Sequence, residues 1–117
     1  MSAPLYQLKA EFFKTLGHPA RVRILELLAV RDHSVGELQP EVGLEASHLS
    51  QQLGVLRRAG VVAARKQGNS VIYSLASPDI GELLDNARTV LTGLLNDQVG
   101  LLKDLRASGR GAPPTAR

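Results

Sequence analysis

The chain has 117 residues, of which 44% are apolar, enough for one modest hydrophobic core. Lysine and arginine outnumber aspartate and glutamate by 14 to 11, a surplus that suits a polyanionic partner without requiring one. Cysteine is absent, which excludes disulfides, thiolate metal sites and a cysteine nucleophile. Neither a signal-peptide layout nor an apolar run of membrane-spanning length occurs, so we expect a single-domain cytoplasmic protein with no membrane contact.

The first thirty residues predict two helices. Residues 5–16 place leucine and phenylalanine on one helical stripe, and Gly17 is a natural stop for this helix. Pro19 suits a first helical position because its missing N–H would be unpaired there in any case. A strongly apolar run follows, and we expect this second helix to end near Arg31.

Two further helices follow around a tight turn. Ser34 and Glu37 fit a capping box at the start of a short helix. This helix should not extend far past Gln39, because Pro40 lacks a backbone donor. Helical spacing resumes over residues 45–59, so the order predicts a helix-turn-helix at about residues 34 to 59.

The remaining elements are a hairpin and a long helix. Residues 61–66 and 70–75 are two β-prone runs around a three-residue loop, which is typical of a β-hairpin. A final helix should begin after Ser77 and reach about Ala107. The sequence thus predicts a mainly helical winged helix-turn-helix domain over residues 1–107, while the Gly-, Pro- and Ala-rich tail 108–117 is predicted to be disordered.

The last helix has a coiled-coil-like seam of apolar residues. Its positions alternate in steps of four and three, with one polar interruption: Ile80, Leu84, Ala87, Leu91, Leu94, Gln98, Leu101 and Leu105. A helix of this length could pack within its own subunit, but a domain this small has little surface to cover it. The seam therefore favours a dimer.

The helix at 45–59 has the character of a DNA-reading element. No acid lies between Ala46 and Ala64, whereas ordinary polar helix faces usually mix both charge signs. Polar side chains on this helix, and basic or amide groups at its end and on the hairpin, are the predicted DNA contacts: Ser47, His48, Ser50, Gln51, Gln52, Arg57, Arg65, Lys66 and Asn69.

Several of these segments resemble a known family. LGHPARVRIL at 16–25 and SHLSQQLGVLRRAGVV at 47–62, followed by the strand that ends at Leu75, are similar to the ArsR/SmtB family of bacterial repressors. The similarity extends over about residues 5 to 105, and the opening segment is particularly similar to nickel-linked actinobacterial members. The resemblance implies a homodimer that places two recognition helices in successive major grooves of an inverted repeat.

The same resemblance implies a dimer interface formed by the first and last helices. The predicted interface residues are Leu5, Leu8, Phe12, Leu84, Ala87, Leu91, Leu94 and Leu101. Burial of such apolar side chains against a second copy is the expected source of association.

Many family members release DNA on binding metal, through cysteines in the third helix or His and Asp ligands on the last helix. Here the third-helix positions at which the resemblance implies cysteine ligands are occupied by Gln39 and Glu41, and the last helix has no histidine. We therefore expect that no cofactor is required. A non-standard nickel or zinc site remains an alternative. Its candidate ligands are His18, His33, Glu37 and Glu41, with Asp32 nearby.

Two other classes of function compete with DNA binding. The sequence contains no nucleophile elbow, phosphate loop or metal-protease spacing, so we do not expect an enzyme. A winged helix used only to dock a partner protein is the stronger competitor, and the acid-free helix face disfavours it.

Overall fold

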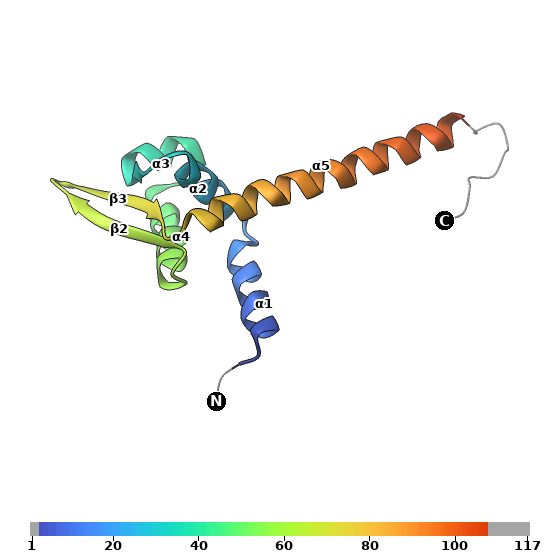
Figure 1. Cartoon of the computed structure of the whole chain (residues 1–117). Coiled ribbons are helices and arrows are strands. Elements are labelled where there is room, and N and C mark those ends of the chain that lie inside the picture. The colour runs from blue at the N-terminus through green and yellow to red at the C-terminus, as the bar shows by residue number, and fades with distance from the viewer. Residues whose placement is uncertain (1–2, 108–117) are drawn as a thin grey trace. The chain divides into compact units, whose positions relative to one another are not determined.

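The computed structural model describes residues 3–107 (Figure 1). The chain divides between Leu84 and Asp85 into two units. The predicted mainly helical winged helix-turn-helix is confirmed. Its elements in chain order are α1 (Leu5–Leu16), α2 (Pro19–Val30), β1 (His33–Ser34), α3 (Val35–Val42), α4 (Ala46–Arg58), β2 (Val62–Gln67), β3 (Ser70–Leu75) and α5 (Pro78–Ala107).

Helices α1 and α2 begin and end where their capping residues predict. The N–H of Gly17 donates to the carbonyl of Lys14 at 3.1 Å and closes α1. The His18 ring accepts a hydrogen bond from the Ala20 N–H at 3.1 Å, so this imidazole caps α2 just before Pro19. His18 therefore has a structural role at the helix entry.

The start of α3 is confirmed and its predicted end is wrong. The Ser34 hydroxyl accepts from the Glu37 N–H at 3.1 Å, and the Glu37 carboxylate accepts from the Ser34 N–H at 2.9 Å. The helix then passes through Pro40 and ends only at Val42. Gly43 closes it with φ of 76° and an N–H bond to the Gln39 carbonyl at 2.9 Å, and this cap holds the last turn despite the donor missing at Pro40.

The wing is a three-stranded antiparallel sheet in the order β1-β3-β2. Its two long strands are close to the predicted hairpin, but Gln67 pairs with Ser70, so only Gly68 and Asn69 form the turn. Strand β1, which pairs His33 with Tyr73, was not predicted. Two residues are too few to show the alternation by which a strand is recognised in a sequence.

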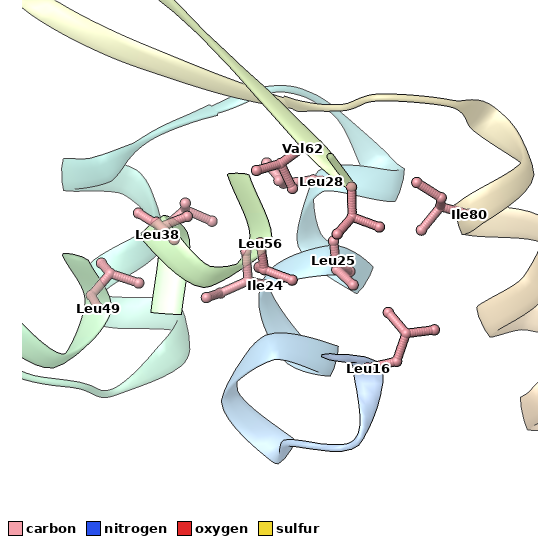
Figure 2. Close-up of a cluster of buried hydrophobic side chains, with 11 residues drawn as sticks. Leu16, Ile24, Leu25, Leu28, Leu38, Leu49, Leu56, Val62 and Ile80 are labelled. Carbon is pink, nitrogen blue, oxygen red and sulfur yellow. The ribbon is translucent and has the colours of Figure 1, made fainter. Parts of the chain in front are cut away.

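One hydrophobic core joins these elements (Figure 2). The apolar sides of α2 and α4 supply most of it, α1, α3 and the start of α5 add one residue each, and the start of the hairpin region adds two. The buried residues are Leu16, Ile24, Leu25, Leu28, Leu38, Leu49, Leu53, Leu56, Val61, Val62 and Ile80. Because Leu49, Leu53 and Leu56 place one side of α4 in this core, the opposite side of the helix faces solvent.

Helix α5 runs for 30 residues, about 45 Å at the usual helical rise. The Ser77 hydroxyl accepts from the Asp79 N–H at 3.2 Å and caps its start. None of the helices within residues 3–107 combines the length and apolar character that crossing a membrane requires. The tail predicted to be disordered, 108–117, lies outside the described residues.

The capping box makes a pH-dependent contribution to stability. The hydrogen bond from the Ser34 backbone, with the nearby Arg31 guanidinium, lowers the pKa of Glu37. A carboxyl group with a lower pKa in the folded state stabilises the fold above its unfolded pKa, and this stabilisation is lost as pH falls through the folded pKa. We therefore expect Glu37→Gln to destabilise the protein at about pH 7 and to have little effect at about pH 3.

Urea unfolding at fixed protein concentration measures this difference. Glu11→Gln is the matched control, because Glu11 is an exposed helical glutamate outside any capping box. A destabilisation by Glu37→Gln that is equal at both pH values would contradict the prediction.

Candidate nucleic-acid interface

The outward side of α4 is polar, as predicted. Leu49, Leu53 and Leu56 are buried, and this packing leaves four side chains exposed to solvent: Ser47, His48, Ser50 and Gln51. Among the described residues none of these four makes a side-chain hydrogen bond. Their donors and acceptors are therefore available to base edges or phosphates.

Arg58 extends this surface, and the acid-free stretch that ends in Arg57, Arg58, Arg65 and Lys66 suits a phosphate backbone, although Arg58 is not among the nine predicted contact residues. It follows Ser47 and Gln51 on one row of the helix, at spacings of eleven and seven residues. Its guanidinium lies over Gly54, with Nη1 3.2 Å from the position that a Cβ there would occupy. The helical spacing in the sequence is sufficient to place Arg58 on this row.

Gln52 differs from the other predicted contacts on α4. Its side chain is half-buried and its Oε1 accepts a hydrogen bond from Nε of Arg21 at 2.7 Å. Consecutive residues on a helix are turned by about 100°, so Gln52 lies towards α2 while Gln51 remains exposed. Gln52 is thus engaged within the protein.

The wing presents its basic residues near the turn. Arg65 and Lys66 are exposed on β2, and Asn69 is exposed in the turn itself. Gly68 adopts φ of 64°, which lets the two strands reverse over two residues. Nη1 of Arg65 lies 2.9 Å from Oδ2 of Asp32, and both side chains are about half-exposed, so we assign this bridge roughly 0.2–1 kcal/mol.

Arg57 and Arg58 stand at the C-terminus of α4. Basic residues in a last turn interact favourably with the helix dipole, so part of their role is structural. The absence of acids between Ala46 and Ala64 is not explained by that role, because the dipole affects only the last turn. A helix and a strand that carry basic and polar residues without acids of their own favour an anionic partner.

Each of the four candidate metal ligands interacts with groups close to it in the fold, and the four do not form a cluster. His33 is buried, with Nδ1 2.8 Å from the Arg31 carbonyl, and Glu41 lies 3.7 Å from the Arg23 guanidinium. His18 and Glu37 cap the starts of α2 and α3. Within residues 3–107, no three His, Asp or Glu side chains are grouped as a metal site would require.

The predicted dimer residues fall into two sets. Phe12 and Leu84 are partly buried against the core, so they contribute to the fold of their own subunit. The rest are exposed: Leu5, Leu8, Ala87, Leu91, Leu94 and Leu101. Further exposed apolar residues were not predicted as interface, namely Phe13 on α1 and Val90, Leu95, Val99 and Leu102 on α5.

The fold and this surface define the class of the protein. It is a winged helix-turn-helix DNA-binding protein, in which α4 is the recognition helix and β2 and β3 form the wing. Comparison with known proteins defines the family.

Residues 18–64 match the family model described as bacterial regulatory protein, arsR family. The HTH-type transcriptional regulator Rv0081 of Mycobacterium tuberculosis is 71% identical over 109 residues, which are 92% of this chain and 96% of that protein. The chain belongs to the arsR family, and it is a transcription regulator rather than an enzyme.

Solved structures agree with the fold. The crystal structure of Rv0081 matches with a TM-score of 0.78 and 72% identity, covering 84% of this chain and 99% of that chain. The solution structure of Mb0332 from Mycobacterium bovis, described as a homodimeric winged helix-turn-helix DNA-binding domain, matches with a TM-score of 0.72 and 28% identity over 80% and 86% of the chains. The biofilm growth-associated repressor of Agrobacterium fabrum is 42% identical over 76 residues, 65% of each chain.

Proposed function

We propose that this chain is a homodimeric repressor that binds an inverted repeat of double-stranded DNA and requires no metal for binding. The observation that supports this proposal best is the outward face of α4, which is polar, free of acids and free of internal hydrogen bonds at four side chains. A recognition helix needs such a face, because base edges are read by donors and acceptors that are not already satisfied.

The contacts divide by chemistry. Ser47, His48, Ser50 and Gln51 on α4 are proposed to read bases, since amide and hydroxyl groups match the donor and acceptor pattern of the major groove. The cationic groups of α4 and the wing are proposed to bind phosphates and position the protein: Arg57, Arg58, Arg65 and Lys66, with Asn69 at the tip of the wing.

Dimerisation is supported by exposed apolar surface. Leu91 and Leu94 are 57% and 54% exposed, and Leu101 is 50% exposed, all on the seam of α5. Leu5 and Leu8 add exposed apolar surface on α1. An exposed apolar seam such as that of α5 is unusual on a soluble monomer, so we propose a second copy as its occupant. Mb0332 is itself described as homodimeric.

Repression is proposed because the Agrobacterium relative is a repressor and because a dimer bound across two grooves would occupy promoter DNA. The alternative is a metal-responsive regulator that uses nickel or zinc, which the resemblance of the opening segment to nickel-linked actinobacterial members implies. The local roles of His18, His33, Glu37 and Glu41 disfavour this alternative.

Substitutions in the recognition helix and in the wing should have different effects on DNA binding. We expect Gln51→Ala to cost roughly 1–3 kcal/mol at particular operator positions and to leave non-specific binding unchanged. Lys66→Ala should weaken specific and non-specific binding alike and reduce the slope of log affinity against log salt by about one per half-site. Fluorescence anisotropy with DNA from upstream of the gene, located first by footprinting, measures both effects.

Gln7→Ala and Lys103→Ala are the matched controls, because both residues are exposed on helices outside the proposed DNA surface. If neither Gln51→Ala nor Lys66→Ala altered DNA binding, docking of a partner protein would become the better function for this winged helix.

Disruption of the α5 seam should disrupt the dimer. Leu94→Glu would bury an unpaired charge at an apolar interface, so we expect the dimer dissociation constant to rise at least about 100-fold. Thr92→Glu adds the same charge to an exposed position outside the seam and should leave the dimer intact. Sedimentation of both variants tests this prediction, and a folded wild-type monomer at micromolar concentration would refute the dimer.

Metals should have little effect on operator binding. Zinc, cadmium or arsenite should change operator affinity less than about tenfold, equivalent to roughly 1.4 kcal/mol of coupling. Anisotropy titrations with and without chelator measure the coupling. A large and chelator-reversible loss of binding would instead support the metal-responsive alternative, with His18 and His33 the first residues to replace.

A further inference from the structure

Arg21 joins three helices of the DNA-binding unit. It lies on α2, half-buried, and its Nε donates to Oε1 of Gln52 on α4 at 2.7 Å. Its Nη1 donates to the carbonyl oxygen of Thr15, in the last turn of α1, at 3.1 Å. One guanidinium group therefore bonds both the recognition helix and the end of α1.

Both partners are groups that need this donor. The last carbonyls of a helix have no partner within the helix, and Thr15 is the penultimate residue of α1. The half-buried amide of Gln52 would otherwise lose a hydrogen bond on leaving solvent. The planar guanidinium supplies two donors in a fixed geometry, which the single ammonium of lysine cannot reproduce.

The hydrogen bond between Arg21 and Gln52 lies next to the residues proposed to read bases. Gln52 directly follows Ser50 and Gln51 on α4, which are proposed to read bases. The buried leucines set which side of α4 faces the core, and a hydrogen bond that holds Gln52 against α2 further restrains the rotation of α4 about its axis and the direction of the neighbouring side chains. Bidentate readout depends on such orientation, because misplacement weakens hydrogen bonds steeply.

We infer that Arg21 is a positioning residue for operator recognition, which acts on DNA through Gln52 and sets the orientation of α4 relative to α1. This inference rests on the proposed function. It also assigns Gln52 an internal role in place of a direct contact with DNA. The sequence alone does not show this pairing, because the two residues are 31 positions apart.

The test uses Arg21→Lys, Gln52→Ala and the double variant in the full-length protein. Arg21→Lys keeps the charge, so non-specific DNA binding and its salt dependence should be unchanged. We expect each single variant to lower operator affinity about three- to tenfold. The double variant should bind operator no more weakly than the weaker-binding of the two single variants, because the two side chains form one interaction. Anisotropy is measured on operator and on non-specific DNA, well below the melting temperature of each variant.

Arg23→Lys is the matched control. Arg23 lies two residues further along α2, but its exposed guanidinium only approaches Glu26 and Glu41, at 3.8 and 3.7 Å. This change should leave the ratio of operator to non-specific affinity as in the wild type. A purely structural role for Arg21 would lower the melting temperature of Arg21→Lys without changing that ratio, and would overturn the inference.

Two further outcomes also decide the matter. Additive losses in the double variant would mean that Gln52 contacts DNA independently of Arg21, and would overturn the inference while the proposed function stands. Wild-type protein that binds operator and non-specific DNA equally would overturn the proposed function, and the inference with it.

Discussion

Burial of one side of α4 is the constraint on which the rest of the structure depends. Leu49, Leu53 and Leu56 are almost inaccessible to solvent, and they pack into the core formed by α2 and its neighbours. With these three leucines buried, the opposite side of the helix must face solvent. The core therefore determines which residues of α4 can reach DNA, although no core residue touches it.

The fold was predictable because its signals are local. Helical spacing located the helices, and caps such as Gly17 and Ser34 located their ends to within a residue or two. The errors occurred where tertiary structure overrode local preference. The third helix continues through Pro40 because a glycine cap secures its last turn, and β1 exists because β3 supplies its hydrogen-bond partners.

The part of the candidate site that could be predicted is the part that helical periodicity determines, namely which residues of α4 are exposed. Spacing separates the buried leucines of α4 from exposed Ser47 and Gln51, and it places Arg58 on the same row as these two. It does not distinguish Gln52 from its neighbours, because a residue at the border of a face is assigned by what packs beside it. That neighbour is Arg21 on another helix, and only the assembled fold brings the two together.

The bridge between Arg65 and Asp32 has a consequence for the ionic strength dependence of DNA binding. Salt dependence arises from mobile ions that leave the nucleic acid when protein cations neutralise its phosphates. Arg65 already has a counterion built into the protein, and the pair together contributes almost no net charge. A phosphate contact by this arginine would therefore release fewer mobile ions than one by Lys66, and the number of ions released would be smaller than the number of basic side chains at the interface.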